Sequence, residues 1–307
     1  MHLKHKRITL LLVLFCAGLL AFYFWPVPNM PFDRLYEKVD PAVGQSLQSF
    51  RSAHPLRQLQ VDGVTWEYIA TAEGQETIVF LHGMTGAYDI WWQQISALED
   101  QYRLISVTYP PVQSLGELDK GLLAILEKEG VQEFHVVGTS LGGYLAQYLL
   151  SQHPERIRRA ILSNTFPPND LLAAQNRVSG ALLPVLPEWL TLAVFRGNFK
   201  QGIYPTSGND ELTLAFLNEI GYGRTSKAQL LGRYYCVIEK FAPASPTIPL
   251  LIIESDNDPL VALTLREQLQ AVYPEATVYT FADAGHFPYL NRDVAYTQII
   301  AAFLSTP

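Results

Sequence analysis

Short runs of apolar residues recur along the chain and predict buried strands. They lie at residues 77–81, 104–108, 134–137, 160–162, 250–253 and 277–281. Segments with helical spacing of apolar positions lie between most of these runs, at residues 90–99, 115–129 and 141–152. Buried strands that alternate with helices are typical of a doubly wound, mostly parallel sheet. The pattern therefore predicts an α/β fold.

Two features modify this simple alternation. Around Asp62-Gly63, apolar and polar positions alternate, which predicts an antiparallel hairpin at the start of the domain. Between Ser163 and Pro249 the strand-helix alternation stops, and apolar stretches are separated by prolines. We expect an inserted helical lid there, at about residues 166–245, above the carboxyl edge of the sheet. Its apolar positions can serve core packing or face an apolar substrate.

The chain starts with a long apolar segment. Residues 8–25 carry no charge and comprise 25 − 8 + 1 = 18 residues, which as a helix would reach about 27 Å. Basic residues precede this run and aromatic residues end it, as is typical of a membrane helix with a cytoplasmic amino end; they are Lys4, Lys6, Arg7, Tyr23, Phe24 and Trp25. The bulky residues at its end do not match a signal-peptidase site.

These features predict three regions. Residues 1–25 are expected to form a single-pass membrane anchor, residues 26–57 a tether, and residues 58–307 a folded domain on the extracytoplasmic side. The alternative is a secreted protein whose signal peptide is cleaved. The oligomeric state is not indicated by the sequence.

Composition excludes several classes of protein. With 49% hydrophobic and 17% charged residues, the chain is a folded protein. The net charge of −7 and the lack of a basic stripe argue against a nucleic-acid groove. Cys16 and Cys236 do not form a metal-ligand motif, so we expect no metal and no organic cofactor.

The strongest chemical motif is Gly138-x-Ser140-x-Gly142, which lies between a predicted buried strand and a predicted helix. Such a strand-turn-helix exposes a serine hydroxyl on a turn so tight that its neighbours must be small. Ser140 is therefore the candidate nucleophile.

A second glycine-containing loop follows the predicted strand at residues 77–81. It reads His82-Gly83-Met84-Thr85-Gly86, and it resembles a loop that directs backbone amides toward a developing oxyanion. We expect the amides of Met84 and Leu141 to form the oxyanion hole. We interpret His82, Gly83 and Gly86 as supporting residues.

The candidate acid and base that would assist Ser140 lie downstream of the predicted lid. After the predicted strand at residues 250–253, the loop contains Asp256 and Asp258, of which we favour Asp258 because Pro-Leu-Val follows it. His286 lies in a loop after the last strand and is the candidate general base, since imidazole titrates near neutral pH. Ser140, Asp258 and His286 follow the chain order Ser, Asp, His of α/β-hydrolase triads.

These residues resemble the α/β-hydrolase superfamily and, within it, the maspardin family. The likeness spans about residues 55–292 and rests on several segments: LISVTYP (104–110), GTSLGGYLAQ (138–147), ILSNTF (161–166), GNF (197–199), YPEA (273–276) and FPYL (287–290). The resemblance implies an α/β-hydrolase fold with a lid. It also implies a soluble intracellular protein, which disagrees with the predicted anchor. Members that lack the catalytic histidine are thought to act as binding or adaptor proteins, whereas this chain has His286.

The expected function is hydrolysis of a small, apolar carboxylic ester through an acyl-enzyme. A noncatalytic binding protein of the maspardin type is the alternative. An epoxide hydrolase or dehalogenase would need an aspartate in place of Ser140. A heme-free haloperoxidase or a carbon-carbon bond hydrolase would use the same triad, and both remain open.

Overall fold

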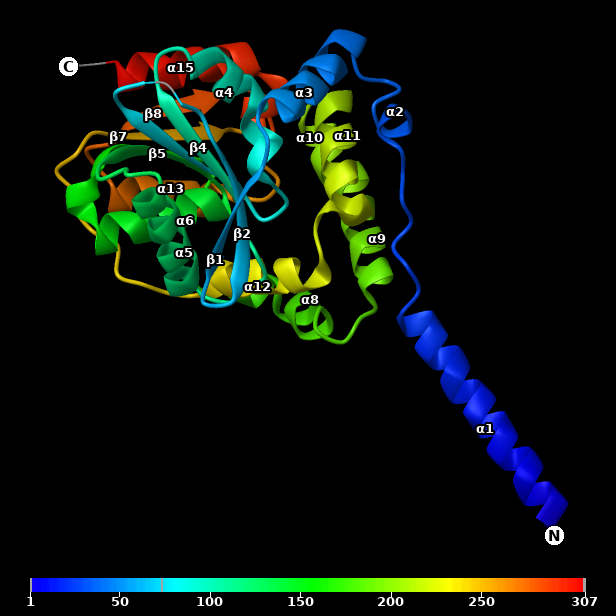
Figure 1. Cartoon of the computed structure of the whole chain (residues 1–307). Helices are drawn as coiled ribbons and strands as arrows, with labels where there is room; N and C mark the ends of the chain where they lie inside the picture. Colours follow the sequence, from blue (N-terminus) through cyan, green and yellow to red (C-terminus); the bar gives the residue numbers. More distant parts are fainter. Residues whose placement is uncertain (1, 73, 306–307) are drawn as a thin grey trace.

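The structure is a computed structural model that describes residues 2–72 and 74–305, with side chains described from residue 8 onward. Eight strands form one sheet in the order β1-β2-β4-β3-β5-β6-β7-β8 (Figure 1). Their bounds are β1 Arg57–Val61, β2 Val64–Ala70, β3 Thr77–Leu81, β4 Arg103–Thr108, β5 Phe134–Thr139, β6 Ile157–Ser163, β7 Leu250–Ser255 and β8 Thr277–Phe281.

Strand directions confirm the predicted fold class. The pairs β1–β2 and β2–β4 are antiparallel, and β3 to β8 pair in parallel. The turn between β1 and β2 is formed by Asp62 and Gly63, whose φ angles of 50° and 79° suit the tight hairpin predicted for this pair.

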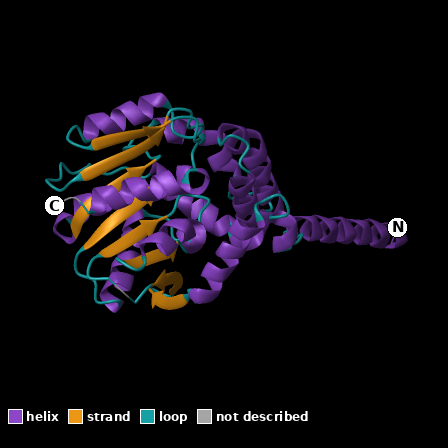
Figure 2. Cartoon of the chain, turned by 90° about the horizontal axis from the view of Figure 1, so that it is seen from above, coloured by secondary structure: helices purple, strands orange, loops and turns teal. Residues whose placement is uncertain are grey.

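Helices cover both faces of the sheet, as Figure 2 shows. The strand β3 is buried along its whole length, and its alternate residues belong to two different cores. Ile78 and Phe80 pack with α4 (Trp92–Leu98) and α15 (Asp293–Leu304), whereas Val79 and Leu81 pack with the opposite layer. That layer contains α5 (Leu115–Lys128), α6 (Leu141–Gln152) and α13 (Leu263–Val272). Burial on both faces explains why these strands are almost entirely apolar.

The lid lies between β6 and β7 and consists of helices. They are α7 Leu171–Gln175, α8 Arg177–Leu182, α9 Glu188–Asn198, η3 Phe199–Ile203, α10 Tyr204–Thr206, α11 Glu211–Glu219, η4 Ile220–Arg224 and α12 Lys227–Ile238. Leu192 is fully buried, and Phe199 and Phe216 join the core that contains Trp92. At these positions the apolar lid residues serve core packing.

The segment expected to be a tether contains two helices, α2 (Phe32–Leu35) and α3 (Pro41–Ala53). The helix α3 starts with a good N-terminal signal, because the side chain of Asp40 accepts a hydrogen bond from Ala42 N at 2.8 Å and proline occupies the first helical position. Leu47 and Phe50 are buried in the core. This segment is therefore packed against the domain.

Five side chains, which we call the Arg51 cluster, join α3 to the body and to the lid; they are Tyr36, Arg51, Asp89, Glu219 and Arg224. Arg51 contacts Asp89 at 2.7 Å and Glu219 at 2.8 Å, and Arg224 contacts Asp89 at 2.8 Å. Tyr36 donates to Glu219 at 2.8 Å. Burial would raise the pKa of the fully buried Asp89, but the two guanidinium groups outweigh it and hold this pKa below its ordinary value.

The predicted membrane anchor at residues 8–25 is wrong, and so is the extracytoplasmic, single-pass location based on it. No helix in the part of the chain that the structure describes is both long enough and apolar enough to cross a membrane. The helix α1 spans His2–Tyr23, so its uncharged part from Ile8 has 23 − 8 + 1 = 16 residues. These cover about 24 Å, less than the ~30 Å of a hydrocarbon core. Trp25 lies beyond the end of the helix.

Candidate active site

Ser140 lies at the turn between β5 and α6, at the carboxyl edge of the sheet. Its backbone has φ 53° and ψ −119°, a strained conformation for a residue with a side chain. The turn is held from the neighbouring strand, because Ser140 N donates to Ser163 O at 3.0 Å and Thr165 Oγ1 donates to Ser140 O at 2.7 Å. This is the geometry that the glycine-serine motif predicts.

The glycines around Ser140 are required by backbone contacts. A Cβ atom on Gly138 would lie 2.2 Å from Gly142 O, and one on Gly142 would lie 2.0 Å from Leu81 O. A Cβ atom on Gly83 would lie 3.1 Å from the Cβ of Ser140. The loop after β3 therefore passes directly beside the serine, as expected for an oxyanion loop.

His82 supports this loop and is not placed to act as a base. Its Nε2 accepts a hydrogen bond from Tyr109 N at 3.3 Å, so the proton is on Nδ1, which donates to Gly83 O at 2.6 Å. Complete burial, together with the charge of Arg233, lowers the pKa of His82 well below its ordinary value. His82 is therefore neutral. Gly86 packs against it so closely that a Cβ atom there would lie 2.6 Å from His82 Cβ.

The two amides expected to form the oxyanion hole belong to the residues that follow Ser140 and Gly83. Leu141 is the first residue of α6, so its N–H is not used within the helix and lies at the positive end of the helix dipole. Met84 follows Gly83 in the loop, and its carbonyl oxygen accepts a hydrogen bond from Arg233.

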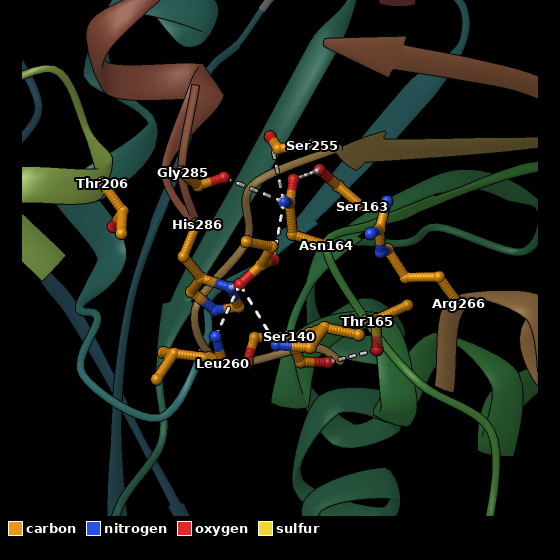
Figure 3. Close-up of polar contacts among 12 residues, drawn as sticks. Ser140, Ser163, Asn164, Thr165, Thr206, Ser255, Leu260, Arg266, Gly285 and His286 are labelled. Atoms are coloured by element: carbon orange, nitrogen blue, oxygen red, sulfur yellow. Dashed lines mark hydrogen bonds and ion pairs between the residues drawn. The ribbon is translucent and has the colours of Figure 1, made fainter. Parts of the chain in front are cut away.

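The structure brings Asp258 and His286 together. His286 Nδ1 lies 2.8 Å from Asp258 Oδ2 and 3.0 Å from Oδ1, and both side chains are almost fully buried. The carboxylate also accepts from Leu260 N at 2.8 Å and Val261 N at 3.1 Å. Figure 3 shows the side chains of His286 and Ser140 directed into the same space. With Nδ1–H bound to the carboxylate, Nε2 is free to accept a proton.

Asp256, the less favoured acid, lies elsewhere. Its Oδ1 accepts a hydrogen bond from Asp283 N at 2.9 Å, at an exposed position. It therefore joins the loop after β7 to the loop after β8 without contacting the imidazole.

Asn164 is a site residue that was not expected from the sequence. Its side chain is buried, and Nδ2 donates to Asp258 Oδ2 at 2.8 Å and to Gly285 O at 3.3 Å. Its backbone φ of 40° lies in the left-handed region, which asparagine tolerates better than most residues. An asparagine directly after a buried strand, at the edge that carries the candidate triad, was the available signal.

The lid contacts the loop that carries His286. Asn257 Nδ2 donates to Thr206 O at 2.8 Å, and Asn257 Oδ1 accepts from Gly285 N at 2.8 Å. A Cβ atom on Gly285 would lie 2.9 Å from Thr206 O. The end of α10 therefore covers the histidine loop.

Two surface hollows lie away from this site. One of about 410 Å³ is lined by residues that include His54 and Glu99, and one of about 310 Å³ by residues that include Tyr88 and Arg224. Neither is lined by Ser140, Asp258 or His286. Among the described residues, no group of three or more histidine, cysteine or acidic side chains is arranged to hold a metal ion.

Comparison with known proteins agrees with the fold. Residues 114–293 match the family described as alpha/beta hydrolase fold. Maspardin from Mus musculus is 26% identical over 263 residues, which cover 81% of this chain and 84% of maspardin. A hydrolase from Pseudomonas aeruginosa PA01 has a similar structure, with a TM-score of 0.70, 22% identity and coverage of 82% of this chain and 98% of that chain.

The enol-lactonase from Burkholderia xenovorans LB400 also has a TM-score of 0.70, at 17% identity, and covers 81% of this chain and 100% of its own. The resemblance to the superfamily and to maspardin, inferred from sequence segments, is thus confirmed. The family match spans more than half of the chain and includes Ser140, Asp258 and His286. The chain belongs to the α/β-hydrolase fold family.

Proposed function

We propose that this protein is a serine hydrolase that cleaves carboxylic esters through an acyl-enzyme intermediate. The observation that carries the proposal is the contact of 2.8 Å between His286 and the buried Asp258, at the sheet edge where the strained turn presents Ser140. A carboxylate that fixes the tautomer of an imidazole beside a serine is the arrangement that activates a hydroxyl for attack.

In the first step, Ser140 Oγ attacks the ester carbonyl carbon while His286 Nε2 takes the hydroxyl proton. The carbonyl oxygen becomes an oxyanion, which the amides of Leu141 and Met84 stabilise. Collapse of the intermediate breaks the bond to the alcohol oxygen, and the alcohol leaves with the proton from His286. Water then attacks the acyl-enzyme by the same route and releases the carboxylic acid and free Ser140.

The substrate class proposed is a small ester with an apolar acyl group. The basis is the lid, which carries apolar side chains that are not used in core packing; Val178, Val185 and Val194 are 71%, 63% and 50% exposed. A lactone is a cyclic ester, so the activity named for the structurally similar enol-lactonase falls in the same reaction class.

The proposal is tested by labelling the full chain with a fluorophosphonate probe and by assaying p-nitrophenyl acetate, butyrate and octanoate. Wild type is expected to label and to turn over these esters, with a preference for the longer acyl groups. The Ser140→Ala variant is expected to do neither. Ser151→Ala is the matched control, because Ser151 lies on the same helix and its hydroxyl contacts that helix alone, donating to Tyr148 O at 2.7 Å and accepting from Gln152 Nε2 at 3.1 Å.

The alternative, a binding protein with an inactive site, is suggested by the likeness to maspardin. It predicts that wild type neither labels nor hydrolyses any of the three esters, although it folds. That result would remove the catalytic proposal, whereas labelling confined to Ser140 would remove the alternative.

A further inference from the structure

A buried arginine of the lid contacts backbone carbonyl groups of the oxyanion loop. Arg233 lies on α12, and its residue is only 2% exposed. Its Nη1 donates to Met84 O at 2.7 Å and to Gly86 O at 3.2 Å, and its Nη2 donates to Tyr109 O at 3.1 Å. One guanidinium thus joins the lid to two loops at the carboxyl edge of the sheet.

This cation has backbone carbonyls instead of a carboxylate as its partners. Among the described residues, no acidic side chain forms an ion pair with Arg233. Burial lowers the pKa of Arg233 to about 10, so the group is still protonated at neutral pH. Burying an unpaired charge is unfavourable unless hydrogen bonds compensate it. Two of the three carbonyl groups that compensate the charge of Arg233 belong to the candidate oxyanion loop.

The two peptide groups that flank the Cα atom of Met84 are both held. The first peptide is fixed because its carbonyl, Gly83 O, accepts from His82 Nδ1 at 2.6 Å. Since N–H and C=O point in opposite directions in a trans peptide, this bond directs the N–H of Met84 away from His82. The second peptide is fixed because its carbonyl, Met84 O, is bound by Arg233.

Tyr109 connects these two supports. Its N–H donates to His82 Nε2 at 3.3 Å, and its ring lies 3.9 Å from that of His82. Its carbonyl oxygen accepts from Arg233 and also from Gln229 Nε2 at 2.9 Å. Because Gln229 and Arg233 are four residues apart on α12, one face of this helix holds Tyr109 and, through it, His82.

We propose that Arg233 is a positioning residue for the oxyanion hole, through which the lid helix α12 sets the direction of the Met84 amide and adds a positive charge behind it. This inference rests on the proposed serine-hydrolase function. It implies that the lid takes part in stabilising the transition state, in addition to covering the site.

The test compares Arg233→Met and Arg233→Lys with wild type in steady-state turnover of p-nitrophenyl butyrate. Loss of one oxyanion-hole donor lowers kcat by about 10²–10³-fold in other enzymes, so we expect Arg233→Met to lower kcat by ~10²-fold with little change in KM. Lysine keeps the charge but not the forked contacts, and its loss should be about tenfold. Binding of phenylboronic acid, whose adduct with serine is a tetrahedral anion, should weaken in the same order.

Arg196→Met is the matched control. Arg196 is also a lid arginine that donates to a backbone carbonyl, Gly221 O at 2.5 Å, but that carbonyl belongs to the lid itself. This variant should lose thermal stability and keep kcat. Unchanged kcat and boronate affinity in a folded Arg233→Met variant would overturn the inference. Failure of both Arg233 variants to fold would also overturn it, since the residue would then hold the fold. A wild type without turnover would instead reject the proposed function.

Discussion

Asn164 and His286 bind the same carboxylate oxygen. Asn164 Nδ2 donates to Asp258 Oδ2 at 2.8 Å, and His286 Nδ1 lies at 2.8 Å from that oxygen. The amide therefore orients, together with the N–H groups of Leu260 and Val261, the carboxylate that orients the imidazole. Since Asn164 is the central residue between Ser163 and Thr165, which hold Ser140, one short segment positions the serine and the acid together.

Replacing Asn164 with glycine should lower kcat by roughly tenfold while KM changes little, because the carboxylate loses one hydrogen bond but its contact with His286 remains. Glycine tolerates the backbone φ of 40°, so the variant removes the amide without adding strain. Kinetics with p-nitrophenyl butyrate and a melting curve give the answer. A kcat equal to that of wild type would show that Asp258 needs no such support.

Replacing Asp258 with asparagine should reduce kcat by about 10⁴-fold, because an amide can stabilise the wrong tautomer of His286. Replacing His286 with alanine should remove the base and reduce kcat by several orders of magnitude. Single-turnover labelling with a fluorophosphonate measures both effects on Ser140. The control is Asp256→Asn, which lies outside the contact with His286 and should label at the wild-type rate. Normal labelling of Asp258→Asn would assign the role of the acid to another residue.

Replacing Gly142 with alanine should prevent correct folding, since the added Cβ atom would lie 2.0 Å from Leu81 O, a backbone atom of the central sheet. Gly116→Ala in α5 is the matched substitution, because its Cβ atom would only touch Tyr148 Oη at 3.7 Å. It should leave stability unchanged or raise it by up to ~1 kcal/mol. Circular dichroism melting distinguishes the two variants, and a Gly142→Ala protein as stable as wild type would contradict the described turn.

Stability should fall as the pH drops below about 6.5, the ordinary pKa of histidine. Burial lowers the pKa of His135 despite the nearby Glu76, so the folded protein binds the proton more weakly than the unfolded chain does. The unfolded state therefore takes up more protons below pH 6.5 and is favoured by up to about 1.4 kcal/mol per pH unit per histidine. Melting temperatures between pH 8 and pH 5 should decline less steeply in His135→Leu than in wild type. Equal slopes would show that protonation of His135 does not cause the loss of stability.

Replacing Arg51 with methionine should destabilise the protein by about 3 kcal/mol or somewhat less, because the buried Asp89 would keep only Arg224 as a partner. The control is Arg34→Met. Arg34 contacts Glu37 at 3.6 Å with its side chain 74% exposed, so its loss should change stability by less than ~1 kcal/mol. Urea denaturation of both variants measures the difference. Equal midpoints would mean that the Arg51 cluster contributes little.

Sequence patterns predicted the elements whose signals are local. The apolar runs matched β3 to β7 because both faces of the parallel sheet are covered there. The run at 277–281 also forms a strand, β8, but only Phe281 of it is buried. Asp62-Gly63 located the hairpin because few other residues adopt its turn. The helix α3 was missed although Val43, Leu47 and Phe50 have helical spacing, because residues 26–57 contain five prolines and were assigned to a tether as a whole. The anchor prediction failed because the end of α1 at Tyr23 could not be read from hydrophobicity alone.

Residues that act across the fold were beyond local patterns. Asn164 and Arg233 each lie far along the chain from the groups they bind, at separations of 94 and 149 residues for Asp258 and Met84. Nothing next to Arg233 in the sequence indicates its partners, whereas Asn164 could be noticed only from its place directly after a buried strand. The motif residues were found because a strained turn limits which side chains can neighbour it, whereas a long arginine fits many surroundings.

The Arg51 cluster has a consequence for protein engineering. Lids are natural modules to exchange between related hydrolases, and the obvious segment to transplant here starts after β6 and ends before β7. That segment would carry Glu219 and Arg224 into the new host but leave Arg51 and Asp89 behind, so the two charges would keep only their mutual contact of 3.5 Å. A working chimera would have to take α3 and η1 (Tyr88–Trp91) together with the lid, because ion pairs join these three segments although they are separate in the sequence.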